Sequence, residues 1–136
     1  MPFVRIALKV ELPAPAKRLI AETVHGALVS SLGIPIGDRF QIVTTHGNDL
    51  IYDEGYMDME RTDGVVFIQI VMALGRTVEQ KKALFVALAS GLELSCGVAP
   101  DNVFVTLVEN ARENWSFGKG IAQYADSAPP HLSVTQ

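Results

Sequence analysis

The chain has 136 residues, of which 49% are hydrophobic and 19% charged, so it suits one domain with a substantial core and carries less charge than is typical. Its net charge is −4 and it has no run of Lys or Arg, which argues against a nucleic-acid partner, because neutralising phosphates takes clustered cations. Because no apolar run is long enough for a transmembrane helix, no signal peptide is evident and Cys96 is the single cysteine, we expect a cytoplasmic protein with no membrane partner.

The first half of the chain predicts a strand, a helix and a second strand. Residues 3–10 alternate so that one face, with Val4, Ile6, Leu8 and Val10, is wholly apolar, and prolines end this strand. Residues 16–32 have the apolar spacing of a helix that packs on that face. After a turn, the β-branched run 40–45 predicts another strand.

The second half repeats this order after a polar loop at residues 46–63. Residues 65–73 are apolar at almost every position and predict a central parallel strand that is covered on both faces. Residues 77–96 predict a helix, and residues 103–109 predict the last strand. The buried stripe of that helix is expected to contain Phe85, Leu88, Ala89, Leu92 and Cys96.

A spacing of 64 residues relates the two halves. Gly33, which should end the first helix, corresponds to Gly97 after the second, and the same spacing sets Pro2 opposite Val66. We therefore expect a tandem β-α-β repeat.

The repeat predicts an α/β (α+β) fold in one domain, residues 1–124, with units at about 2–45 and 65–109. Right-handed crossovers should give a four-stranded sheet with two helices on one face. The other face, if apolar, needs another subunit. Residues 125–136 contain two adjacent prolines and are expected to form a loose or partner-bound C-terminal tail.

Pro2 is the first candidate for chemistry. If Met1 is removed, Pro2 has a free secondary amine, and α-amino groups titrate at about 7.7–8.0 when unperturbed. Asp38 comes just before the second strand and Arg76 just after the central one, and sites in open α/β sheets gather at strand ends. Taken singly, each has an ordinary structural explanation: a common second residue, a turn aspartate and a solvated surface charge.

Trp115 and Phe117 lie in a predicted loop, where they form either the wall of a small-molecule pocket or a plug at a subunit contact. The three histidines are isolated, and no Cys or His pair has the spacing of metal ligands. There is also no phosphate-loop or dinucleotide-binding glycine pattern. We expect no metal and no cofactor.

Together with Pro2, three stretches of the chain resemble the tautomerase superfamily, and within it the malonate semialdehyde decarboxylase branch. They are GDRFQIV at residues 37–43, RTVEQK at 76–81, and VEN with WSFGKG between 108 and 120. The resemblance thus covers nearly the whole chain. It implies the trimeric tautomerase fold, and a cofactor-independent enzyme that acts on a small oxo acid.

The same resemblance implies a role for each candidate residue. Pro2 would be the catalytic amine, Asp38 its acid–base partner, and Arg76 the residue that binds and polarises the substrate. The hydrophobic wall of the substrate site would be formed by Trp115, Phe117 and Tyr124.

Leu74 is the clear departure from the family pattern. The decarboxylases carry two arginines flanking a proline in this turn, whereas here the turn reads Leu74-Gly75-Arg76. Leu74 would therefore line the substrate site without the charge that decarboxylation uses. Two enzymatic interpretations follow: a keto–enol tautomerase, or a malonate semialdehyde decarboxylase- or hydratase-like lyase with weakened decarboxylation. The alternative is a catalytically decayed homotrimer that serves as a binding or scaffold protein.

Overall fold

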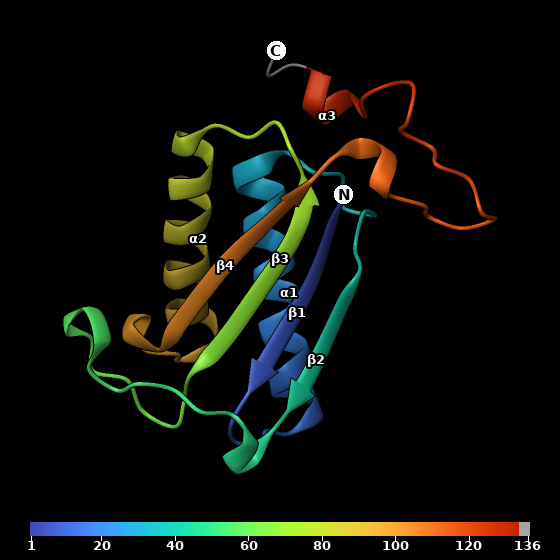
Figure 1. Cartoon of the computed structure of the whole chain (residues 1–136). Helices are drawn as coiled ribbons and strands as arrows, with labels where there is room; N and C mark the ends of the chain where they lie inside the picture. The colour runs from blue at the N-terminus through green and yellow to red at the C-terminus, as the bar shows by residue number, and fades with distance from the viewer. Residues whose placement is uncertain (134–136) are drawn as a thin grey trace.

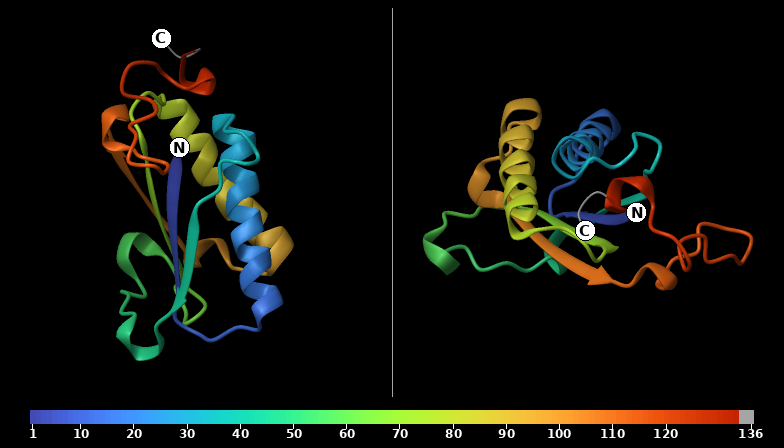
Figure 2. Two further views of the ribbon diagram at one scale, coloured as in Figure 1. Left: turned by 90° about the vertical axis from the view of Figure 1, so that its right-hand side faces the viewer. Right: turned by 90° about the horizontal axis from the view of Figure 1, so that it is seen from above.

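A four-stranded sheet in the order β2-β1-β3-β4 carries two long helices on one face (Figures 1 and 2). This is a computed structural model, and it describes residues 1–133. The strands are β1 (Pro2–Leu8), β2 (Gln41–Thr45), β3 (Val66–Ala73) and β4 (Val103–Asn110). The helices are α1 (Ala14–Leu32), α2 (Val78–Cys96) and the short α3 (Pro130–Ser133). Four short 3-10 turns lie in the connections: η1 (Gly47–Asp49), η2 (Tyr56–Asp58), η3 (Pro100–Asn102) and η4 (Arg112–Asn114). The predicted fold class is confirmed.

The sheet is mixed, because β1 is parallel to β2, β3 is parallel to β4, and the central pair β1 and β3 is antiparallel. The prediction that 65–73 is a central strand is confirmed, but it is parallel to only one neighbour. Arg5 and Gln69 occupy equivalent places in the two units, 64 residues apart, and they pair with each other across β1 and β3. The two units are therefore related by an approximate twofold rotation about this pair.

The core lies between the sheet and the helices. The predicted apolar face of β1 is confirmed for Val4, Ile6 and Leu8, none of them more than 2% exposed, whereas Val10 lies beyond the strand and is exposed. β3 buries one face in the core, while its other face is only partly covered, so the prediction that both faces are covered is wrong for a single chain.

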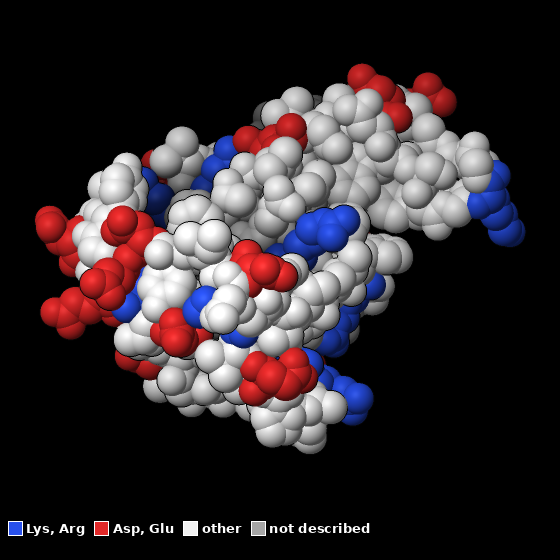
Figure 3. Space-filling view, turned by 60° about the horizontal axis from the view of Figure 1, so that its bottom comes forward, with Lys and Arg blue, Asp and Glu red and all other residues white. Residues whose placement is uncertain are grey.

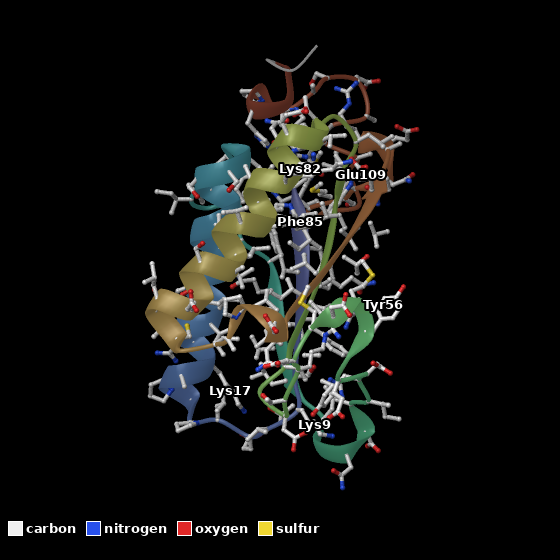
Figure 4. All side chains as sticks on the ribbon, turned by 90° about the vertical axis from the view of Figure 1, so that its left-hand side faces the viewer. Lys9, Lys17, Tyr56, Lys82, Phe85 and Glu109 are labelled. Carbon is white, nitrogen blue, oxygen red and sulfur yellow. The ribbon has the colours of Figure 1, made fainter. Side chains whose placement is uncertain are left out.

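The predicted buried stripe of α2 is confirmed at Leu88 and Leu92 but wrong at Phe85. Leu84 is fully buried together with Leu88 and Leu92, whereas Phe85, which is labelled in Figure 4, is 39% exposed. A spacing of exactly four residues keeps the three leucines on the side of α2 that faces α1 and the sheet. Phe85 instead lies over the beginning of β4, where it lines a shallow cavity with Phe104.

The two long helices end 64 residues apart, which is the repeat spacing found in the sequence. Gly33 and Gly97 both end their helices in the left-handed conformation, each with φ 68°. Thr77 is the N-cap of α2: its hydroxyl accepts a hydrogen bond from the Gln80 backbone, and the Gln80 side chain accepts one from the Thr77 backbone. This capping box fixes the chain direction immediately after Arg76.

The sheet face away from the helices is partly exposed and combines apolar side chains with the polar Arg5 and Gln69 at its centre. The rings of Phe67 and Phe104 contact each other there at 5.2 Å, with Phe104 49% exposed and Val108 42% exposed. Lys and Arg side chains are scattered rather than clustered over the surface that Figure 3 presents. The apolar part of this face, around Phe67, Phe104 and Val108, is suited to covering by another protein surface.

Candidate active site

The topology brings four chain segments to one end of the sheet. β1 and β2 begin at this end, while β3 and β4, which run the opposite way, finish there (Figure 1). As a result the N-terminus, the turn at Asp38, the segment at Arg76 and the loop that holds Trp115 lie next to one another. These segments are far apart in the sequence, and their side chains build the candidate site.

The N-terminal amine forms an ion pair with the Asp38 carboxylate, and the Asp38 side chain is only 16% exposed. In a chain that keeps its first residue, this amine belongs to Met1 and the Pro2 nitrogen is an amide. The Met1 amine therefore stands in for the Pro2 amine of a trimmed chain, which would begin one residue later. Burial lowers the pKa of the amine from its ordinary 8.0, while the hydrogen bond and charge of Asp38 oppose this and Arg76 adds to it.

Arg76 lies beside this pair and is only 8% exposed. Its Nη1 donates a hydrogen bond to the carbonyl of Ala73 at 3.1 Å, which holds the side chain at the end of β3. Burial lowers the pKa of Arg76, and the charges of Asp38 and Glu109 oppose that shift. Glu109 is itself paired with Lys81 of α2 at 2.7 Å (Glu109 is labelled in Figure 4). A largely buried guanidinium that makes one side-chain hydrogen bond within residues 1–133 is suited to binding a carboxylate.

An aromatic wall closes the site on one side. The rings of Trp115 and Phe117 are stacked at 5.9 Å, and Tyr124 meets Phe117 edge-on at 5.7 Å. The indole N–H of Trp115 donates to the Asn110 side chain at 2.6 Å, which fixes the ring relative to the end of β4. The buried side chain of Met1 packs against this wall. The residues proposed for the wall from the sequence thus come together around the N-terminus.

The structure brings together all the predicted site residues except Leu74. The backbone N–H of Leu74 extends the sheet by donating to the Asn110 carbonyl at 2.9 Å, but its side chain is 57% exposed. It is not part of the apolar cluster that surrounds Met1. A role for Leu74 in contacting substrate therefore stays a prediction.

Two cavities adjoin Phe117. One, of about 260 Å³, is lined by Asp38, Phe117, Tyr124 and His131 together with Pro35, Gly37 and Pro130. The other, of about 630 Å³, is open to the outer sheet face and is lined by Arg39, Phe40, Trp115 and neighbouring residues. No sequence signal pointed to His131, which is isolated in the tail, and Glu109 and Asn110 stood out only as part of the family-like VEN stretch, without a role.

The opposite end of the sheet has non-ionisable side chains at the three positions that correspond to the site residues. The 64-residue spacing relates Pro2, Asp38 and Arg76 to Val66, Asn102 and Leu12 respectively. All three of these line a cavity of about 360 Å³. The Asn102 side chain is used structurally, because its oxygen and nitrogen bond the Thr62 backbone and hydroxyl. The amine, carboxylate and guanidinium therefore occur together at one end of the repeat.

The site offers groups for binding an anion and for moving a proton. A buried amine with a lowered pKa is suited to act as a base near neutral pH, and a guanidinium stabilises negative charge that develops on oxygen. Within residues 1–133, no three His, Cys, Asp or Glu side chains are placed to hold a metal ion. In the same part of the chain no helix has the length and apolarity to cross a membrane.

Comparison with known proteins finds a matching family model and a similar curated protein, and both are described as tautomerases. A family model described as "Tautomerase enzyme" matches residues 38–118. The probable tautomerase YusQ of Bacillus subtilis (strain 168) is 36% identical, over 90% of this chain and 98% of its own length.

Two solved structures of malonate semialdehyde decarboxylases are similar along most of the chain. One is FG41 malonate semialdehyde decarboxylase inhibited by 3-bromopropiolate, which is 41% identical with a TM-score of 0.85, covering 90% of this chain and 93% of that one. The other is a malonate semialdehyde decarboxylase for which decarboxylase and hydratase activities are described, 31% identical with a TM-score of 0.85, covering 89% and 94%.

Proposed function

Because this chain belongs to the tautomerase family, we propose that it is a cofactor-independent keto–enol tautomerase of a small oxo acid, with the amine of Pro2 as its acid–base group. The observation that carries the proposal is the buried N-terminal amine, which is paired with Asp38 and lies beside the buried Arg76. Removal of Met1 is part of the proposal, since only then is the Pro2 nitrogen basic.

In the proposed reaction, Arg76 binds the substrate carboxylate through its guanidinium N–H groups. The neutral Pro2 nitrogen takes a proton from the carbon next to the carbonyl, so negative charge develops on the carbonyl oxygen. Transfer of that proton from the Pro2 amine to the oxygen gives the enol, and the reverse sequence gives the keto form. Asp38 stabilises the protonated amine between these two proton transfers.

The position of Met1 supports a substrate site beneath the aromatic wall. Its side chain is 1% exposed and packs in one cluster with Ala73, Trp115, Phe117 and Tyr124. In a trimmed chain that space is available to a ligand, next to the new amine. The Met1 side chain thus marks the place of the apolar part of a substrate such as phenylpyruvate.

We propose a homotrimer as the working assembly. The support from this chain is the partly exposed apolar face of the sheet around Phe67, Phe104 and Val108, which calls for another protein surface. Elution of the protein at the mass of one chain in gel filtration would contradict a trimer.

Asp38→Asn is expected to move the acidic limb of the pH profile of ketonisation to lower pH. The base must be neutral, so kcat/KM rises as pH increases through the pKa of the amine. In the native protein Asp38 raises that pKa against the effect of burial, and the variant removes this contribution. The measurement is kcat/KM for phenylpyruvate ketonisation across pH, with Asp126→Asn as a control at an exposed carboxylate. A limb that stays in place, or moves to higher pH, would contradict the assigned pairing.

A second candidate function is decarboxylation of malonate semialdehyde, which the similarity to the two decarboxylase structures favours. In that reaction a protonated Pro2 would polarise the carbonyl, and the apolar wall would disfavour the charged carboxylate and so promote loss of CO2. Leu74 departs from the two-arginine pattern that the resemblance to the decarboxylase branch implies for this turn. By analogy with the loss of one oxyanion donor, the missing cation should cost about 10²–10³ in rate. We therefore expect ketonisation to exceed decarboxylation.

Leu74→Arg is expected to raise the rate of decarboxylation of malonate semialdehyde about tenfold or more, because it returns a cation to the turn before Arg76. Ketonisation should change much less, since Arg76 already binds the carboxylate. Leu74→Met is the matched control, because it provides an unbranched side chain of comparable length without charge. If decarboxylation by the arginine variant equals that of the methionine variant, the missing cation is not what limits the reaction.

The two activities should be measured side by side on the wild-type protein. Phenylpyruvate ketonisation well above background, with slower decarboxylation, is the result that the proposal predicts. The remaining alternative, a decayed binding or scaffold protein, predicts neither activity, or rates that do not change in Pro2→Ala.

A further inference from the structure

The C-terminal segment covers the end of the sheet where the N-terminal amine lies. Seen from above, α3 lies directly next to the N-terminus (Figure 2, right). Ala128 packs against the cluster that contains Met1 and Ala73, and Pro129 is buried. The part of the predicted tail before residue 134 is therefore packed over the site, and residues 134–136 of that tail lie outside the described residues. This packing brings His131 into the cavity that Asp38 lines.

His131 has a polar atom that the fold leaves unsatisfied. Its Nε2 is shielded from solvent and has no hydrogen-bond partner among the residues that the structure describes. A buried nitrogen without a partner is unfavourable, and such groups in native folds call for an explanation. The other histidines are used differently: Nε2 of His25 is bonded to the Ile36 carbonyl, and that of His46 to the Thr44 hydroxyl.

We propose that His131 is a further substrate-contacting residue, whose Nε2–H donates a hydrogen bond to the carbonyl oxygen of the bound oxo acid. The inference rests on the proposed function, because it takes the oxo acid as the ligand of this site. In this arrangement Arg76 binds the carboxylate, and the carbonyl oxygen is directed toward His131 and the cavity beside Asp38.

The charges around His131 favour a neutral imidazole. Burial lowers the pKa of His131, the N-terminal amine and Arg76 lower it further, and Asp38 opposes them. In a neutral imidazole one nitrogen donates and the other accepts, so a donor at Nε2 leaves Nδ1 unprotonated. A neutral donor polarises a carbonyl less than a guanidinium does. This fits an enzyme that stabilises an enol while lacking the arginine replaced by Leu74.

Two variants of His131 distinguish a hydrogen bond to the substrate from simple packing of the tail. His131→Ala removes both the donor and the ring, whereas His131→Gln places an amide N–H near the position of Nε2 and fills part of the same space. His46→Ala, at an exposed histidine at the other end of the sheet, is the matched control. Each variant would be assayed for kcat and KM in phenylpyruvate ketonisation.

We expect kcat/KM to fall about 5- to 100-fold in His131→Ala, the range for loss of one hydrogen bond to a reacting group. His131→Gln should recover most of that loss, and His46→Ala should match the wild type. Wild-type rates in His131→Ala would overturn the proposal. So would equal losses in the alanine and glutamine variants, because these would show that only the fit of the ring matters.

A binding measurement tests the contact between His131 and the ligand without relying on turnover. Malonate is the probe, added to uniformly ¹⁵N-labelled wild-type protein while the imidazole nitrogens are followed by NMR. We expect malonate to shift the His131 resonances and to leave those of His25 and His46 in place. An unchanged His131 would overturn the contact. Failure of the proposed function shows instead as equal turnover in the wild type and Pro2→Ala, whatever malonate does to His131.

Discussion

Pro2→Ala is expected to lower kcat/KM for phenylpyruvate ketonisation about 10²-fold or more, within the range of about 10²–10⁴ for loss of a positioned acid–base group. The variant keeps a chain-terminal amine after removal of Met1, so a residual rate should remain. It loses the ring that joins the nitrogen to the start of β1 and so fixes where its lone pair points. The loss should appear mainly in kcat, because Arg76 and the aromatic wall still bind the substrate.

The matched control for this variant is Pro15→Ala, at an exposed proline in the first turn of α1. It makes the same chemical change far from the amine and should leave both kinetic constants within about twofold of the wild type, as is usual for surface substitutions. Circular dichroism and thermal unfolding would confirm that both variants are folded. Equal ketonisation by the wild type and Pro2→Ala would favour the binding or scaffold protein over the enzyme.

Arg76→Ala is expected to lower kcat/KM about 10²–10³-fold, because it removes the cation that binds the substrate carboxylate and stabilises charge on oxygen. Most of the effect should be an increase in KM if the main role is to hold the carboxylate. Arg76→Lys keeps the charge but not the planar fork, so it should recover only part of the loss. Steady-state kinetics that separate kcat from KM is the measurement.

Because Arg76 is buried, its variants also need a stability control. The side chain is 8% exposed and bonds the Ala73 carbonyl, so Arg76→Ala should also reduce the free energy of unfolding, by about 1–3 kcal/mol. Chemical denaturation would measure this loss, and kinetics should be taken where every variant is folded. Arg18→Ala, at an exposed arginine of α1, is the control for loss of a positive charge. Unchanged kcat and KM in Arg76→Ala would remove Arg76 from the site.

The sequence was sufficient to predict the repeat and to name candidate site residues at strand ends, whose roles stay predictions. Matching positions such as Gly33 and Gly97 define two β-α-β units, and the order of elements then places Pro2, Asp38 and Arg76 at strand ends. What it did not reveal was the direction of β3, because an apolar run looks the same whether its neighbour is parallel or antiparallel. Its two-sided apolar character reflects a face that a single chain leaves partly open.

Other features of the fold depend on tertiary packing, which local sequence patterns do not predict. Leu84 and Phe85 are adjacent and both apolar, so the sequence did not reveal that Leu84, rather than Phe85, is buried with Leu88. His131 is isolated in a proline-containing tail without periodicity, and only the path of the chain back over the N-terminus brings it near Asp38. Leu74 is recognisable as a departure from a family pattern, but its exposure is a property of the fold.

The central claim is that the Pro2 nitrogen is a free amine, and the intact mass of the protein tests it most directly. The protein should be produced without an N-terminal tag, purified, and measured by mass spectrometry, with sequencing of the N-terminal peptide. We predict a mass lower by one methionine residue and an N-terminal peptide that begins with Pro2-Phe3. A protein that uniformly keeps Met1 would contradict the account, because its Pro2 nitrogen is an amide and its buried Met1 side chain occupies the space assigned to the substrate.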